Sequence, residues 1–353
     1  MVSNSLFSSH SNLSIALHLS FLSKGYRKPI LLLFFLSPLA GEGLSGSTPP
    51  FAFLNPGVLF LLGSLYGSGA LLVRDYARRW KKGWRSILVL GAAYGIVEEG
   101  IMVRSFFNPS WKDLGVLATY GRWLGVNWVW AEWLTIYHAI FSITIPIFLA
   151  ELTYPQTRSQ VWLSLRSRVF FHALLVFSII LGFFAFPYNA SVLAIAGCVA
   201  AVAVLGWIAK RIPNIVPSER TLRVSWKPLV LIGVSVPAVF FFLFNTALIP
   251  YAIGTMILGA FLVLGYERLL SRWATKGFTD LQRLSLIAGA IGFWALFFDS
   301  ILEIIGRLGT SLLGLSFVLY IFFLRKKTLG HLVPTPLYEI GAGGSKRTEP
   351  VPR

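Results

Sequence analysis

Long apolar stretches alternate with short polar connections along most of the chain. About 20 consecutive apolar residues are enough for an α-helix to cross the hydrocarbon core of a bilayer. By this criterion the sequence predicts about ten membrane-spanning helices, in an all-α polytopic bundle. The expected spans are residues 29–44, 56–73, 86–106, 128–152, 169–186, 190–209, 228–248, 251–269, 284–305 and 308–324.

The composition supports a membrane protein and excludes a soluble globular one. Hydrophobic residues make up 56% of the chain, charged residues only 13%, and the mean hydropathy is +0.71. Soluble domains have about 25% charged residues. A soluble chain this apolar would have too few polar side chains to cover its surface, so we expect the lipid bilayer to be its main partner.

The positive charges indicate the orientation of the chain rather than a nucleic-acid partner. The net charge is +17, and all but four of the 31 Lys and Arg residues fall in alternate connections. The four exceptions are Arg104, Lys112, Arg122 and Arg307. Because basic residues concentrate in cytoplasmic loops, the pattern predicts that both termini are cytoplasmic. The compact loops and the lack of a targeting signal favour the plasma membrane of a prokaryote.

The connections also suggest a division of the chain. We expect a Ser-rich cytoplasmic N-terminal extension (residues 1–28), a first membrane half (29–209), a cytoplasmic connection (210–227), a second membrane half (228–324) and a disordered basic tail (325–353). The only cysteine, Cys198, falls in an apolar span. A disulfide framework and a cysteine-based metal site are therefore excluded.

Ionisable residues at membrane depth are the strongest functional signal. Glu98 and Glu99 lie in the third expected span and His138 in the fourth. Such residues are costly in a bilayer and usually mark a functional site. From the rise of about 1.5 Å per residue, all three lie in the outer half of the bilayer. Since neighbours on a helix are about 100° apart, the two glutamates are expected to face different neighbours.

Other polar residues are candidates for the edge of this site. Asp299 and Glu303 lie one helical turn apart near the outer end of the ninth span, and we consider them possible further ligands. Glu42, Arg104 and Asp113 lie in or beside outer connections and are candidate substrate-contacting or rim residues.

Three kinds of function remain open. Carboxylate oxygens and an imidazole are suitable ligands for a divalent metal, zinc foremost, so Glu98, Glu99 and His138 suit a metal-dependent hydrolase. The same groups suit the relay of a proton- or ion-coupled transporter. In a non-catalytic scaffold they would only satisfy one another. The expected substrate is a membrane-embedded peptide, a small molecule or an ion.

The spacing of these residues resembles a known family. Glu98-Glu99 followed by Arg104, and then His138 on the next span, is similar to the motifs of the CAAX-protease and bacteriocin-processing family of intramembrane proteases. The resemblance implies a metal-dependent protease with the glutamates and histidine in its site. The chain departs from the family pattern at Arg104, which is one residue too far from the glutamates, and at Leu134, where the family has Phe. Residues 41–151 also look like a group of uncharacterised prokaryotic multi-pass proteins.

Overall fold

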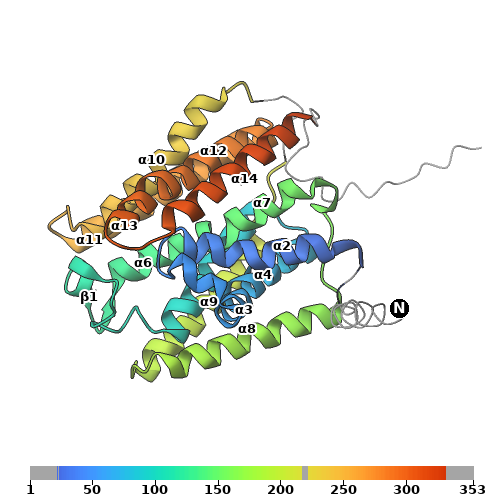
Figure 1. Ribbon diagram of the computed structural model, residues 1–353. Helices are drawn as coiled ribbons and strands as arrows, with labels where there is room; N and C mark the ends of the chain where they lie inside the picture. Colours follow the sequence, from blue (N-terminus) through green and yellow to red (C-terminus); the bar gives the residue numbers. More distant parts are fainter. Residues whose placement is uncertain (1–21, 23, 217–221, 331–353) are drawn as a thin grey trace, which may run out of the picture.

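The computed structural model describes residues 22, 24–216 and 222–330, and most of these residues are helical (Figure 1). The predicted all-α polytopic bundle is confirmed. Seven helical runs are long and apolar enough to span a membrane. They are Pro56–Arg79, Trp128–Thr153, Leu165–Ala185, Val192–Arg211, Trp226–Asn245, Ala252–Thr275 and Asp280–Ile304.

The other three expected spans are also helical, but they do not meet this criterion. They correspond to α2 (Arg27–Pro38) with η2 (Leu39–Gly43), to α5 (Trp84–Ile96) with η5 (Val97–Met102), and to α14 (Thr310–Gly330). Helix α14 continues six residues past the expected end of the last span. Most of the expected N-terminal extension and basic tail lies outside the described residues.

The long runs combine several elements. Pro56–Arg79 consists of α3 (Pro56–Leu62), η4 (Gly63–Gly67) and α4 (Ser68–Arg79). Trp128–Thr153 consists of α6 (Trp128–Tyr137), η7 (His138–Thr144) and α7 (Ile145–Thr153). Asp280–Ile304 consists of α12 (Asp280–Gly292), η9 (Phe293–Phe298) and α13 (Asp299–Ile304). The single-element runs are α8 (Leu165–Ala185), α9 (Val192–Arg211), α10 (Trp226–Asn245) and α11 (Ala252–Thr275).

Short elements occupy the connections. The 3₁₀ turns are η1 (Lys24–Tyr26), η3 (Pro50–Leu54), η6 (Gly115–Ala118) and η8 (Pro155–Thr157). Strands β1 (Arg122–Trp123) and β2 (Val126–Asn127) pair antiparallel in a hairpin just before α6. This hairpin and η6 belong to the connection between the third and fourth expected spans, residues 107–127.

The run α6–η7–α7 lies at the centre of the bundle. In its most apolar stretch 78% of residues are buried, against 17% in α8 and 11% in α9 and α11. Buried side chains of α6 and η7 pack with those of α10, α12 and α14 in one core. Figure 1 shows α10 to α14 (yellow to red) as one layer, with α8 along the opposite edge of the molecule. Of these spans, α8, α9 and α11 are therefore the least covered by the rest of the bundle.

Both described ends of the chain lie at the same end of the bundle. The hydroxyl of Tyr26, just before α2, donates to Gln160 Oε1 at 2.8 Å. Lys327, near the end of α14, donates to the carbonyl oxygen of Thr153 at 2.5 Å. Gln160 and Thr153 both belong to the region where α7 leads into α8. This geometry agrees with termini on one side of the membrane; that this side is cytoplasmic stays a prediction from the charge pattern.

Within the described residues, five segments are π-helical rather than α-helical: η2, η4, η5, η7 and η9. A π segment closes its hydrogen bonds from residue i to i+5, and such segments often occur at functional sites. Four of these five contain the polar side chains described below, and the fifth immediately precedes Asp299.

Candidate functional site

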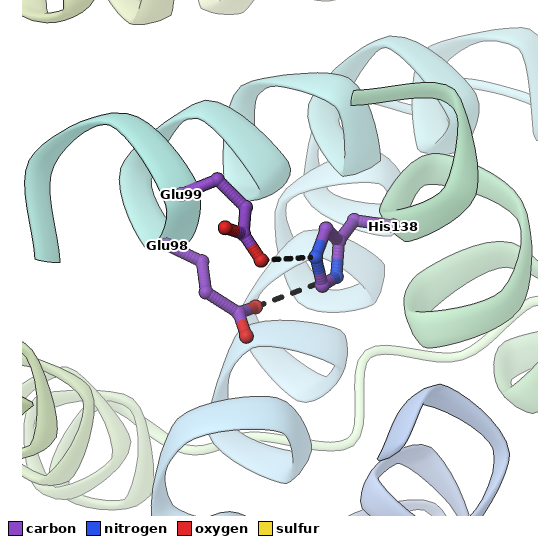
Figure 2. Close-up of side chains that lie close together, drawn as sticks. All are labelled: Glu98, Glu99 and His138. Atoms are coloured by element: carbon purple, nitrogen blue, oxygen red, sulfur yellow. Dashed lines mark hydrogen bonds and ion pairs between the residues drawn. The ribbon is translucent and has the colours of Figure 1, made fainter. Parts of the chain in front are cut away.

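Glu98, Glu99 and His138 lie together in the interior of the bundle. Both glutamates belong to η5, and His138 is the first residue of η7. His138 Nε2 is 3.1 Å from Glu99 Oε1, and its Nδ1 is 3.4 Å from Glu98 Oε2 (Figure 2). One donor atom from each residue can be chosen so that all three lie within 4.8 Å of one another. Two helices therefore bring the three expected residues into one cluster, the Glu/His cluster.

The expectation that the two glutamates face different neighbours is wrong. Figure 2 shows their carboxylates approaching the same imidazole, one at each ring nitrogen. An angle of about 100° between neighbours holds for the Cβ directions of a regular α-helix and does not include the length of a glutamate side chain. Here the backbone is π-helical, and the imidazole offers two nitrogens on different edges of the ring.

Glycines on α5 allow η7 to approach closely. A Cβ atom at Gly91 would lie 2.9 Å from the Cα of Ala139, and one at Gly95 would lie 2.9 Å from the Cβ of His138. Both distances are shorter than real side chains adopt, so a larger residue at either position would push the helices apart. The small residues of the third span thus place the imidazole beside the glutamates.

Hydroxyl groups and an indole surround the Glu/His cluster. His138 Nδ1 is 2.9 Å from Ser142 Oγ, one turn along η7. Ser105 Oγ donates to Glu99 Oε2 and accepts from the indole nitrogen of Trp130 at 3.0 Å. These contacts fix the orientation of the imidazole and of one carboxylate, as second-layer partners do in metal sites.

A second pair of polar residues, Glu42 and Tyr66, extends the cluster toward the connection that follows η2. The Tyr66 hydroxyl, in η4, is 2.5 Å from Glu42 Oε1 and also contacts Glu98 Oε1. Thr48 Oγ1 donates to Glu42 Oε2 at 2.7 Å. A phenol has one hydrogen to donate. When both of its carboxyl contacts are hydrogen bonds, one of the two acids must be protonated and donate to the phenol oxygen.

The Glu/His cluster is withdrawn from solvent. Glu98 and His138 are each 3% exposed and Glu99 is 9% exposed, whereas Glu42 is half-buried. A buried carboxylate is stable only when it is paired, hydrogen-bonded or protonated. Two acids share one imidazole here, and Tyr66 joins a third acid, Glu42, to them, so the group needs a bound proton or a cation to balance its charge.

Comparison with known proteins identifies the family of the chain. A profile described as an uncharacterized membrane protein family matches residues 31–328. The chain belongs to this family. No curated protein and no solved structure matches it. Membership agrees with a multi-pass membrane protein but names no activity, and it supplies no link to the CAAX-protease family, so that resemblance stays a prediction.

The expected rim residues of this family member lie in three different settings. Glu42 joins the Glu/His cluster through Tyr66, as described above. Arg104 adopts a left-handed backbone conformation (φ 58°) and donates to the carbonyl oxygens of Phe183 and Phe186 at the end of α8. Asp113 is exposed in the connection that precedes α6.

The two acids of the ninth span are not part of the cluster. Glu303 accepts hydrogen bonds from the backbone nitrogens of Gly309 at 3.0 Å and Ser311 at 3.1 Å, so it caps the start of α14. Asp299 is fully buried between its own helix and α14. Among the described residues, the group that could hold a metal contains neither of them.

Sequence reasoning missed the hydroxyl groups of the site. Tyr66, Ser105 and Ser142 are uncharged, and such residues are common in apolar spans. The available signal for Tyr66 was its position in the small-residue stretch Gly63-Ser64-Leu65-Tyr66-Gly67, where helices can pack closely.

Another buried charged group lies at the opposite end of α7. Glu151 Oε1 is 2.9 Å from Arg74 Nε and 2.6 Å from Arg78 Nη2, and all three side chains are buried. The Arg74 guanidinium also lies 3.3 Å from the centre of the Trp162 ring. This group ties α4 to α7 and to the connection that follows α7, away from the Glu/His cluster.

Proposed function

We propose that this membrane protein is a metal-dependent intramembrane hydrolase whose single divalent ion, zinc, is bound by Glu98, Glu99 and His138. The observation that supports the proposal is the convergence of three donor atoms within 4.8 Å of one another in the bundle interior. Catalytic zinc sites use three protein ligands and keep a fourth position open. A cluster of two carboxylates and one imidazole satisfies that number.

The surroundings of the three residues fit a metal ion. Glu98 Oε2 is buried and has no hydrogen-bond partner among the described residues, so one lone pair is available. Ser142 is within hydrogen-bonding distance of His138 Nδ1, which leaves Nε2 for the ion. Ser105 contacts Glu99 Oε2, so Glu99 Oε1, which now lies 3.1 Å from His138 Nε2, is the oxygen that would bind the ion. The donor set is therefore oriented before any ion arrives.

Each polar residue then has a role in hydrolysis. A divalent ion in this position would polarise a scissile carbonyl and activate water. Glu98 is the ligand best placed to exchange a proton, because Tyr66 connects it to Glu42 and hence toward Thr48. The outer-half position suits a peptide or small molecule embedded in the membrane.

Metal analysis of the purified protein tests the proposal. The wild type in detergent is compared by inductively coupled plasma mass spectrometry with the double variant Glu98→Gln/Glu99→Gln. Glu267→Gln is the matched control, since that acid pairs with Arg85 at a partly exposed position. We expect close to one metal per chain in the wild type and control and none in the double variant. A wild-type protein that contains no metal would overturn the proposal of a metal-dependent hydrolase.

Proton- or ion-coupled transport is a second candidate, supported by the row of contacts Thr48–Glu42–Tyr66–Glu98–His138. Such a row can pass protons between the outer connection and the bundle interior. Proteoliposomes loaded with a pH-sensitive dye would acidify after an outer acid pulse, and Glu42→Gln would slow this response. Equal rates in the variant and the wild type would argue against the relay. If Glu98→Gln/Glu99→Gln left both assays unchanged, a scaffold role would be favoured.

A further inference from the structure

Asp299 is a buried acid that the proposed site does not use. It is the first residue of α13, directly after the π segment η9, and its exposed fraction is 0%. Neither Oδ1 nor Oδ2 has a hydrogen-bond partner among the described residues. An unpaired carboxylate in an apolar interior is among the least stable arrangements in a protein, and more so at membrane depth.

The carboxyl group points into the contact between α13 and α14. A Cβ atom at Gly314 of α14 would lie 2.6 Å from Asp299 Oδ2 and 2.6 Å from the carbonyl oxygen of Ala295. Gly314 therefore makes room for the acid. The hydroxyl of Thr310, at the start of α14, also connects the two helices by donating a hydrogen bond to the backbone oxygen of Asp299 at 2.9 Å.

The charged and titratable side chains near Asp299 form their hydrogen bonds with groups other than the Asp299 carboxyl. On its own side, Glu303 caps α14, and Arg307 donates to the carbonyl oxygen of Gly46. From α6, Tyr137 contacts the Trp294 ring, but its hydroxyl donates to the carbonyl oxygen of Gly41 at 2.7 Å. The basic residues of α10, α12 and α14 lie at the opposite ends of those helices. Among the residues that the structure describes, no positively charged group forms an ion pair or hydrogen bond with the Asp299 carboxylate.

We propose that Asp299 is a proton-binding site, and that α14 packs against η9 and α13 only while this carboxyl is protonated. A proton is favoured over a metal cation, because hard cations need several oxygen ligands and Asp299 supplies only its own two. Ionisation would place an unpaired charge against the backbone of Gly314. Loss of the proton would therefore separate α14 from α13 and admit water.

Infrared spectroscopy of the wild type tests the protonation state without any substitution. The chain has four aspartates; Asp75 and Asp280 pair with arginines, and Asp113 is exposed. Protein labelled with ¹³C in the aspartate carboxyl groups should show, at neutral pH, a label-shifted band of a protonated acid. Asp299→Asn should remove that band and Asp113→Asn should not. A neutral-pH spectrum without such a band would overturn the proposal.

Thermal unfolding in detergent tests the consequence for packing. The folded protein holds a proton on Asp299 that the unfolded chain releases above about pH 4. Since the folded state then binds more protons than the unfolded state, this contribution to stability falls as the pH rises. Asp299→Asn mimics the neutral acid and should melt above the wild type at alkaline pH, with a flatter pH dependence. If the variant melted below the wild type at every pH, the ionised carboxylate of Asp299 would be the stabilising form, and the proposal would be wrong.

Discussion

The Tyr66 hydroxyl lies 2.5 Å from Glu42 Oε1 and also contacts Glu98, so one phenol joins acids from two separate helices. Glu42 belongs to η2 and Glu98 to η5, and neither is hydrogen-bonded directly to the other among the contacts of the described residues. Tyr66 therefore links Glu42 of η2 to the Glu/His cluster.

Tyr66→Phe should destabilise the protein. The substitution keeps the ring but leaves buried carboxyl oxygens without their partner, which typically reduces the free energy of unfolding by about 1–3 kcal/mol. Thermal unfolding in detergent measures the loss. The matched control is Tyr26→Phe, whose hydroxyl bonds Gln160 in an exposed setting and should matter much less. Equal melting temperatures for the two variants would contradict a structural role for the Tyr66 hydroxyl.

Glu151→Gln should be more harmful than the removal of a surface ion pair. Glu151 is the carboxylate for both Arg74 and Arg78, and all three are buried. Leaving buried charges uncompensated costs about 3–5 kcal/mol. Glu267→Gln removes a pair whose side chains are 31% and 27% exposed, worth about 0–1 kcal/mol. Urea or thermal unfolding of both variants measures the two losses of stability. A larger loss in Glu267→Gln than in Glu151→Gln would show that Arg74 and Arg78 find other partners.

Gly289→Ala should disrupt the packing of α10 on α12. A Cβ atom at Gly289 would overlap the carbonyl oxygen of Val230, and one at Gly233 would overlap that of Leu286. Overpacking of this kind costs about 1–3 kcal/mol. Gly265→Ala on the lipid-facing α11 meets no atom within 4 Å and should be neutral or slightly stabilising. Thermal unfolding of the two variants in parallel measures the two changes in stability. A Gly289→Ala variant as stable as the wild type would mean that α10 and α12 are not in close contact.

Zinc added to protein that has first been stripped of metal by a chelator should raise the melting temperature of the wild type but not that of His138→Ala. A ligand that binds only the folded state stabilises it by about 2.7 kcal/mol at one hundred times its dissociation constant. His172→Ala is the matched control, since His172 bonds Tyr76 and lies outside the Glu/His cluster. Chelation should reverse the shift in the wild type and control. A zinc-induced shift that persists in His138→Ala would place the ion elsewhere.

The fold class and the centre of the candidate site could be predicted from the sequence because they depend on strong local signals. Apolar runs near 20 residues define membrane helices, and a charged residue inside such a run is conspicuous. Glu98, Glu99 and His138 stand out for that reason, and the structure brings them together. Whether they bind metal or catalyse a reaction stays a prediction.

The rest of the site depends on relationships that no local pattern expresses. The participation of Ser142 and Tyr66 follows from helix packing, which a single sequence does not reveal. Glu42 was expected as a rim residue at the end of the first span, but no local pattern indicated that its carboxylate lies against Tyr66. Glu98 and Glu99 meet the same imidazole because its two nitrogens lie on different edges of the ring, and the angle between neighbours on a helix does not express this side-chain reach.

The π segments imply that the polar centre is unusually sensitive to chain length. A π segment resembles an α-helix that has accepted one additional residue, and it is retained only where the surroundings favour it. Deleting a single residue from Val97–Met102 would allow η5 to relax to an α-helix and would rotate every side chain beyond it. Conservative substitutions of the apolar residues of η5 should therefore be tolerated far better than the deletion of one of them, such as Ile101.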